Sequence, residues 1–140
     1  MCKWLKGLFM GKEYKVVEYN QIFQAILKFV TNPQAIIKVC DMKYRLPIKE
    51  DIRRFLSKDG LNNRTYKKDF FDCDDYSIVL LGRLREWKSG LACGIVHVET
   101  NEGRHALNFF IDDQLTFWYI EPQNDNIFRA ENYKPYFILI

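Results

Sequence analysis

Three residue types that together perform thiol catalysis occur in this sequence in a suggestive order. Cys73 begins a strongly helical segment, and the only two histidines, His97 and His105, follow it. Thiol catalysis needs a thiolate, a histidine that exchanges a proton with it and a third group that orients the histidine. A helix start favours the thiolate, because unpaired backbone N–H groups present partial positive charge there. Cys73 is therefore the candidate nucleophile.

The candidate third group is Glu121, which we find by counting residues outward from a short turn. If that turn is centred on Asp113, His105 lies opposite Glu121. Directly opposed residues on neighbouring strands have Cβ atoms about 4.5–5.5 Å apart, so the two side chains are expected to bond unless a bulge shifts the register. Pro122 then ends the strand and leaves Glu121 at the rim of the sheet. The same count around the preceding turn places Glu99 opposite His105 as a weaker competitor.

Four carboxylates surround the candidate nucleophile: Asp69, Asp72, Asp74 and Asp75. Negative neighbours raise the pKa of a thiol, so the unaided site is expected to be a poor nucleophile. A protonated His105 or a divalent cation would reverse this effect. Clustered carboxylates are hard oxygen ligands of the kind that Ca²⁺ prefers, and Asp74 and Asp75 are the candidate metal ligands. The alternative is an ordinary acid-rich helix start, and the segment does not match an EF-hand loop.

The spacing of apolar residues predicts the elements that position these side chains. Helical spacing predicts a helix with Asn20 as its N-cap, and a second that Gly60 ends. A third has Asp72 as its cap, and Ile78 and Leu81 widen its apolar stripe, so we expect it to be largely buried. These helices span residues 19–30, 47–60 and 72–89.

After Gly90 the apolar period changes from 3.6 to 2, which predicts strands. Residues 35–40 form either a strand or a short helix. Helices followed by an antiparallel meander predict an α+β fold. The aromatic strand that contains residues 117–119 is compatible with a cleft, a homodimer face or ordinary core packing. The predicted strands span residues 92–100, 104–112, 115–121 and 136–140.

Length and composition exclude several classes of protein. The chain has 140 residues, of which 48% are hydrophobic and 16% aromatic; this predicts a single folded domain, residues 1–140, rather than disorder. No apolar run approaches the ~20 residues of a transmembrane helix. The N-terminal segment is too broken by Lys6 and Gly7 for a signal peptide, so we expect a cytoplasmic or particle-associated protein. The four cysteines form no C-x-x-C pair and are interpreted as reduced thiols.

The net charge of +3 conceals two unlike halves. Residues 1–68 carry a balance of +9, and residues 69–140 carry a balance of −6. A basic half is compatible with nucleic-acid binding, but no nucleic-acid motif accompanies it, and solvated helix faces explain it better. The acidic half contains the carboxylates around Cys73 and is interpreted as part of a cation-dependent thiol site.

Three short motifs resemble the papain-like cysteine-protease domain of the Marasmius oreades agglutinin and its relatives. They are the D-C-D-D segment at Cys73, the H-A-x-N segment at His105 and the E-P-Q segment at Glu121. The resemblance covers residues 45–130. It implies a papain-like or transglutaminase-like fold, a Cys73–His105–Glu121 triad and calcium-dependent proteolysis of a protein or peptide substrate, without an organic cofactor. The first 45 residues are too few and too helical for a β-trefoil, so we predict an N-terminal helical extension (1–45) before a catalytic core (46–140), and carbohydrate binding is not carried over.

These observations predict a cysteine peptidase or amide hydrolase, with two alternatives left open. One is a non-catalytic papain-like scaffold that serves as a binding or structural module, for example in a viral particle. The other is a transglutaminase-like acyl transferase, which differs only in the second acceptor. Acyl transfer also needs an oxyanion hole. The backbone N–H of Cys73 is the first donor, and the upstream stretch offers Asn62, Asn63 and Tyr66 for the second, but no glutamine.

Overall fold

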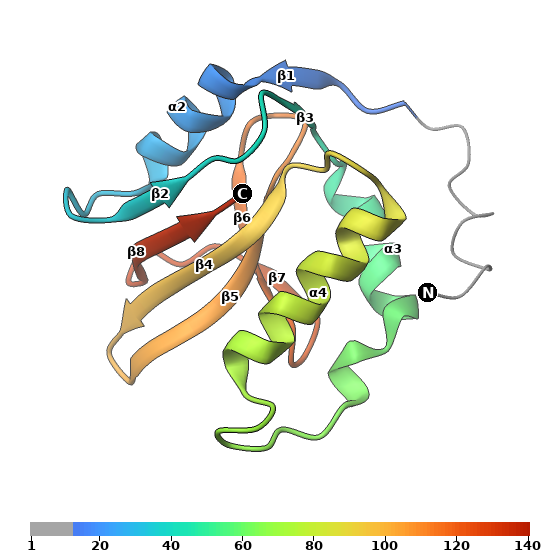
Figure 1. Ribbon diagram of the computed structural model, residues 1–140, viewed down its shortest axis with the longest axis vertical. Helices are drawn as coiled ribbons and strands as arrows, with labels where there is room; N and C mark the ends of the chain where they lie inside the picture. Colours follow the sequence, from blue (N-terminus) through green and yellow to red (C-terminus); the bar gives the residue numbers. More distant parts are fainter. Residues whose placement is uncertain (1–12) are drawn as a thin grey trace.

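A six-stranded sheet organises the part of the chain that the structure describes (Figure 1). This structure is a computed structural model, and it describes residues 13–140; the N-terminal segment considered as a signal peptide lies outside these residues. The strand order is β2-β8-β4-β5-β6-β7. The strands are β2 (Ile36–Lys38), β4 (Cys93–Thr100), β5 (Gly103–Ile111), β6 (Phe117–Glu121), β7 (Asn126–Phe128) and β8 (Lys134–Leu139).

Three α-helices and a small second sheet complete residues 13–140. The helices are α2 (Tyr19–Phe29), α3 (Lys49–Asp59) and α4 (Cys73–Trp87), and the 3₁₀ turn η1 (Leu61–Asn63) follows α3. Strands β1 (Val16–Glu18) and β3 (Lys43–Arg45) pair in antiparallel fashion. The result is the mixed α+β fold that the order of elements predicts. None of these helices is long and apolar enough to cross a membrane.

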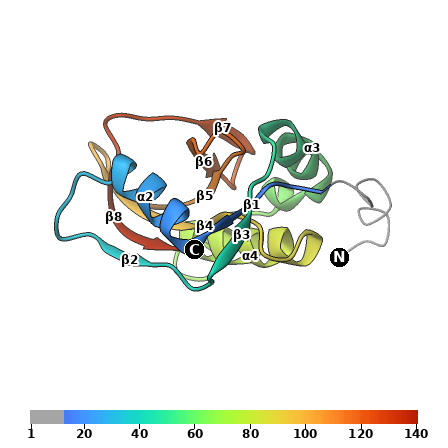
Figure 2. The ribbon, with the colours of Figure 1, turned by 90° about the horizontal axis from the view of Figure 1, so that it is seen from above.

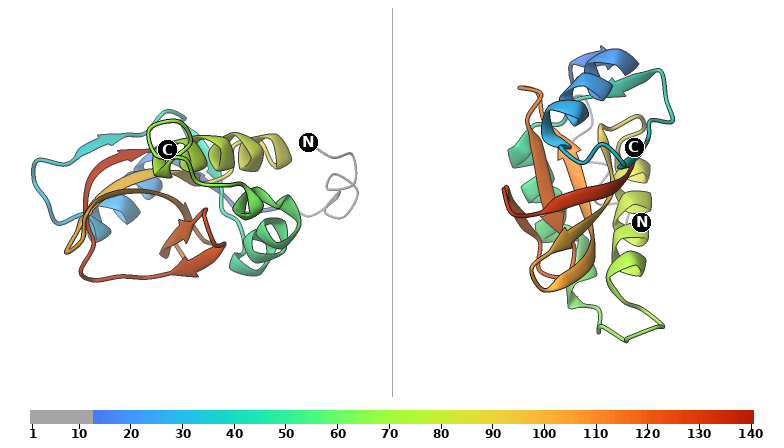
Figure 3. Two further views of the ribbon diagram at one scale, coloured as in Figure 1. Left: turned by 90° about the horizontal axis from the view of Figure 1, so that it is seen from below. Right: turned by 90° about the vertical axis from the view of Figure 1, so that its left-hand side faces the viewer.

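Two hydrophobic clusters sandwich the large sheet, because alternate residues of each strand point to opposite faces. Val96 and Leu107 belong to the cluster with α2, whereas Cys93 and Phe110 belong to the cluster with α3 and α4. Helix α4 lies along β4 and β5, with α3 beside it (Figure 3). Helices α2 and α3 belong to the clusters on opposite faces of the sheet and lie well apart, α2 on the left and α3 on the right of Figure 2. Residues 13–45 thus contribute to both clusters, chiefly to the one with α2, while Tyr14 belongs to the other.

Strand β2, which lies between α2 and α3 in the sequence, joins the large sheet through a parallel pairing. Strand β2 pairs with β8 in parallel, so the segment predicted as strand or helix is a strand. Strand β8 also pairs with β4, and a Cβ atom at Gly94 would lie 2.0 Å from the carbonyl oxygen of Leu139. Glycine is therefore required where these two backbones approach. Strand β7 is an additional strand that the period-2 pattern does not predict.

The predicted helices are close to the observed ones, with one correction to a helix cap and one to the burial of a side chain. Helix α4 has Asp72 as its N-cap, as predicted, and Gly60 ends α3 in the left-handed region at φ 74°. Helix α2, however, begins one residue before Asn20, and its N-cap is Glu18. The prediction that Ile78 is part of the buried stripe of α4 is wrong, because this residue is 58% exposed.

Both predicted hairpin registers need correction. Phe109 lies opposite Tyr119, two residues from the predicted partner, because the β5–β6 loop is longer than expected. The carboxylate of Asp112 folds this loop by accepting hydrogen bonds from the backbone N–H groups of Gln114 and Thr116 and from the indole N–H of Trp118. Loops of this kind form when an Asp side chain accepts hydrogen bonds from backbone N–H groups a few residues further along the chain.

The β4–β5 turn is one residue shorter than predicted. Val98 lies opposite His105, and Glu99 lies opposite Arg104. Glu99 also forms an ion pair with Arg104 at 3.3 Å. The prediction of Glu99 as a competitor for His105 is therefore wrong.

Candidate active site

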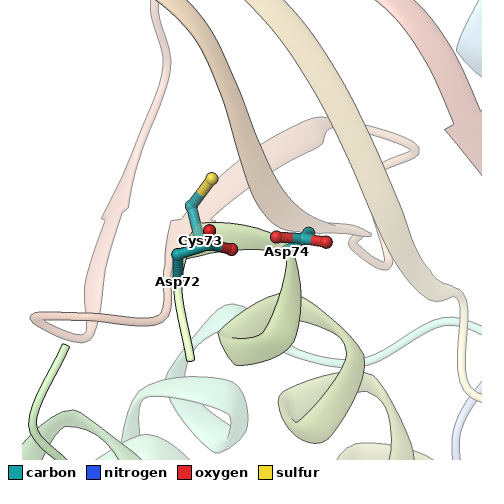
Figure 4. Close-up of side chains that lie close together, drawn as sticks. All are labelled: Asp72, Cys73 and Asp74. Atoms are coloured by element: carbon teal, nitrogen blue, oxygen red, sulfur yellow. The ribbon is translucent and has the colours of Figure 1, made fainter. Parts of the chain in front are cut away.

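Cys73 is the first residue of α4, and the local sequence explains why the helix begins there. The side chain of Asp72 accepts from the helix backbone, while the Asp75 carboxylate accepts from the backbone N–H of Asp72 at 3.1 Å. This reciprocal capping box satisfies donors that a helix start otherwise leaves unpaired. The Cys73 thiol is free and partly exposed, and it projects beyond the end of the helix (Figure 4).

The carboxylate environment of the thiol differs from the one expected. Ligand atoms of Asp72, Cys73 and Asp74 all lie within 4.8 Å of one another. A side-chain hydrogen bond between the two aspartates lowers the pKa of Asp72 and raises the pKa of Asp74. Two carboxyls this close favour one shared proton or a cation between them. Asp74 thus groups with Asp72, whereas Asp75 serves the capping box.

His105 and Glu121 form the shortest side-chain contact of the site. The Nε2 atom of His105 lies 2.6 Å from Oε2 of Glu121, and their side chains are 26% and 16% exposed. In the observed register the two residues are diagonal neighbours on one face of the sheet rather than directly opposed. The other oxygen of Glu121 accepts from the backbone N–H of Gln123 at 3.2 Å, which fixes the carboxylate at the end of β6.

The packing of α4 on the sheet places Cys73 and His105 at the same end of the molecule. Asn108 in β5 donates to the carbonyl of Ser77 in α4 at 2.9 Å. His105 lies three residues before Asn108 on the strand, an odd separation that puts the two side chains on opposite faces of β5, and Cys73 lies four residues before Ser77 on the helix. These separations are about 10 Å along a strand and 6 Å along a helix. Among residues 13–140, no hydrogen bond joins the Cys73 thiol to the His105 ring.

The second histidine faces α4 and has different surroundings. His97 contacts the rings of Tyr136 and Phe137, at 5.9 and 5.1 Å between ring centroids. Burial lowers the pKa of His97, and the negative charge of Asp74 opposes this effect. His97 is therefore near the acidic cluster but belongs to an aromatic environment. Sequence reasoning missed this proximity, because it depends on which face of β4 the helix covers.

The segment before Cys73 folds back on itself and brings Tyr66 close to the site. The backbone N–H of Lys67 donates to the carbonyl of Phe71 at 2.8 Å, with Phe70 exposed at the tip. Desolvation, followed by the charges of Asp72 and Cys73, raises the pKa of Tyr66. Three upstream residues are candidates for the second oxyanion donor. The pKa of Tyr66 is affected by the charge of Cys73, whereas Asn62 and Asn63 lie in η1.

A polar cavity of about 370 Å³ opens beside the His105–Glu121 pair. Its walls come from the β4–β5 hairpin, the end of β6 and the loop before β8. The lining residues are Thr100, Glu102, Gly103, Arg104, His105, Glu121 and Tyr133. The pair is therefore accessible from one side while being largely shielded from bulk solvent.

This helix-and-sheet arrangement, with its motifs, belongs to a known family of domains. Residues 44–127 match the family described as agglutinin C-terminal, so the chain belongs to that family. Two solved structures share its fold. One is the PSL1a–E64 complex, with a TM-score of 0.80 and 25% sequence identity over 89% of this chain and 51% of the other.

The second is the Polyporus squamosus lectin bound to a human-type influenza-binding epitope, Neu5Acα2-6Galβ1-4GlcNAc. It has a TM-score of 0.74 and 25% identity, over 89% of this chain and 49% of the other. The chain therefore spans about half the length of these relatives. No curated protein sequence matches it.

Proposed function

We propose that the chain is a papain-like thiol hydrolase that uses Cys73, His105 and Glu121. The observation that carries this proposal is the 2.6 Å contact between Nε2 of His105 and Glu121. A carboxylate at Nε2 favours the tautomer with the proton on that nitrogen. Nδ1 then carries the lone pair and is free to accept the proton of a thiol. In this proposal residues 46–140 form the catalytic core, with the preceding residues packed against it.

The reaction follows from these roles. Nδ1 of His105 takes the thiol proton, and the Cys73 sulfur attacks a peptide or amide carbonyl to form a C–S bond. Collapse of the tetrahedral intermediate breaks the C–N bond, and the imidazolium delivers its proton to the leaving amine. Water then hydrolyses the thioester. An amine in place of water would give a transglutaminase-like product through the same residues.

Two donors are proposed for the oxyanion that forms during attack. The backbone N–H of Cys73 lies at the start of α4 and is aligned with the helix dipole. The hydroxyl of Tyr66 is the second candidate, supported by the electrostatic influence of Cys73 on its pKa. A tyrosine in this role requires a substrate carbonyl to lie between the thiol and the phenol.

The acidic cluster supports a role for calcium at this site. The carboxylates of Asp72 and Asp74 would hold the ion, and their shared hydrogen bond fits a pair that lacks a neutralising charge. A bound divalent cation would offset the negative charge of the two carboxylates beside Cys73. Asp75, a candidate ligand in the sequence, has its Oδ2 atom engaged by the helix cap.

Alkylation of individual thiols tests this proposal. Cys40 is an exposed free thiol outside the site and is the matched control. With calcium present, we expect iodoacetamide or the epoxide E64 to label Cys73 at least about tenfold faster than Cys40. His105→Gln and Glu121→Gln should abolish the difference. Equal labelling rates at the two cysteines, with and without calcium, would contradict the proposal.

A non-catalytic binding role is the second candidate, and the structural relatives favour it. One relative is named a lectin, and its structure contains a sialylated glycan. If the chain is a binding module, titration calorimetry with that trisaccharide should give saturable binding that Cys73→Ser leaves unchanged. Binding of this kind together with ordinary thiol reactivity would favour the module over the hydrolase.

A further inference from the structure

Asn108 links the helix that begins at Cys73 to the strands that carry the histidine. Its side-chain amide nitrogen donates to the carbonyl of Ser77 in α4 at 2.9 Å and to the carbonyl of Gly94 in β4 at 3.2 Å. The residue is completely buried. One amide group thus bridges two backbone segments and belongs to a third, β5.

The bridge continues to the nucleophile through a single helical turn. The hydroxyl of Ser77 donates to the carbonyl of Cys73 at 2.8 Å. The same residue therefore contacts both Asn108, through its carbonyl, and Cys73, through its side chain. Ser77 is itself completely buried, so water does not compete for these bonds. The path from the strand of His105 to the backbone of Cys73 thus runs through two hydrogen bonds, one between buried groups and one that is part-buried.

Within residues 13–140, only the nitrogen of the Asn108 side-chain amide has hydrogen-bond partners. Its Oδ1 atom is buried and has no hydrogen-bond partner in the described part of the chain. An unpaired buried polar atom lowers stability, and an apolar residue of the same size would avoid that loss. The bond from its nitrogen to Ser77 holds α4 against the sheet, and the bond to Gly94 holds β4 beside β5, which an apolar side chain could not do.

We propose that Asn108 is a positioning residue that sets the height of Cys73 relative to His105. This inference rests on the proposed function. Apolar burial is non-directional, so it leaves a helix more freedom along a sheet than directional hydrogen bonds do. The directional bonds from Asn108 remove that freedom one turn away from the thiol. A misplacement of only about 1 Å can reduce a rate about 100-fold.

Two variants separate positioning from general stability. Asn108→Leu removes both donors at similar volume. Ile26→Val is the control, since Ile26 is equally buried but lies in the cluster with α2, on the other face of the sheet. Each protein is studied below its melting temperature by backbone hydrogen exchange, by hydrolysis of a peptide amide and by the pH dependence of Cys73 alkylation.

For Asn108→Leu we expect faster exchange in residues 77–81 with unchanged exchange in α3, together with about a 10- to 100-fold loss of kcat at nearly constant KM. The pH dependence of Cys73 alkylation should differ from that of the wild-type protein. Ile26→Val should change none of these. Unchanged exchange in residues 77–81 would overturn the inference whether or not the protein is an enzyme.

Faster exchange in residues 77–81 of Asn108→Leu, with unaltered kcat and an unaltered alkylation profile, would also overturn the inference. Asn108 would then hold α4 in place without affecting the reactivity of the Cys73 thiol. If the wild-type protein has no hydrolytic activity and an ordinary thiol, the proposed function fails by itself. In that case the exchange and alkylation measurements still decide whether Asn108 holds the helix and affects Cys73.

Discussion

Replacement of Asp125 by Asn should stabilise the protein at neutral pH. Asp125 lies in the turn that follows Glu121, and its backbone N–H donates to the carbonyl of Glu121 at 2.9 Å. Burial, followed by the negative charge of Asp59, raises the pKa of Asp125 to about 6. Asp125 has a φ of 63°. Asparagine tolerates this left-handed conformation as well as aspartate does, so the variant should keep the turn.

The sign and size of the effect follow from the raised pKa. The folded state binds a proton more tightly than the unfolded state, in which the pKa is ~3.9. The contribution of the protonated Asp125 carboxyl to stability is therefore present below pH 4 and is lost as the pH rises through about 6. A pKa rise of about 2 corresponds to ~3 kcal/mol for a fully buried carboxyl. Asp125 is only partly buried, so we expect about 1 kcal/mol after solvent screening.

Urea unfolding between pH 4 and pH 8 measures this difference. Asp125→Asn should raise the free energy of unfolding by about 1 kcal/mol at pH 7.5 and leave it nearly unchanged at pH 4. Glu131→Gln, which removes an exposed carboxylate elsewhere, controls for net charge and should have little effect. A stabilisation of Asp125→Asn that is the same at both pH values would refute the electrostatic reasoning.

Three further predictions concern the sheet and the site. Gly94→Ala should destabilise the protein by about 3 kcal/mol or more in chemical denaturation, because the new Cβ atom would lie 2.0 Å from the Leu139 oxygen. Tyr66→Phe should reduce kcat for amide hydrolysis by about 10- to 100-fold with little change in KM, and an unchanged kcat would exclude the phenol as an oxyanion donor. Asp74→Asn should abolish the calcium stimulation of Cys73 alkylation, whereas removal of calcium by a chelator should slow only the wild-type protein.

The sequence is sufficient to predict α4 and the position of Cys73 within it. The acids at Asp72 and Asp75 are local signals, since a helix cap depends on residues only three positions apart. The change of apolar period after Gly90 likewise predicts β4, β5 and β6. Such features are decided by neighbours in sequence, and the structure confirms them.

Features that depend on how separate elements meet could not be predicted in the same way. The bridge from Asn108 to Ser77 requires a helix and a strand 31 residues apart to lie side by side. The proximity of Asp74 to His97 depends on the same packing. The parallel pairing of β2 with β8 connects distant parts of the chain, and a three-residue strand leaves too short a pattern to reveal its partner.

The two register errors had different consequences, because side chains alternate between the faces of a sheet. The β5–β6 prediction was wrong by two residues, which keeps every side chain on its face. Glu121 therefore remains on the face of His105 and reaches it diagonally, at 2.6 Å. The β4–β5 prediction was wrong by one residue, which moves Glu99 away from His105 and opposite Arg104. The His105–Glu121 pair is thus determined by alternation along the strands rather than by the length of the turn between them.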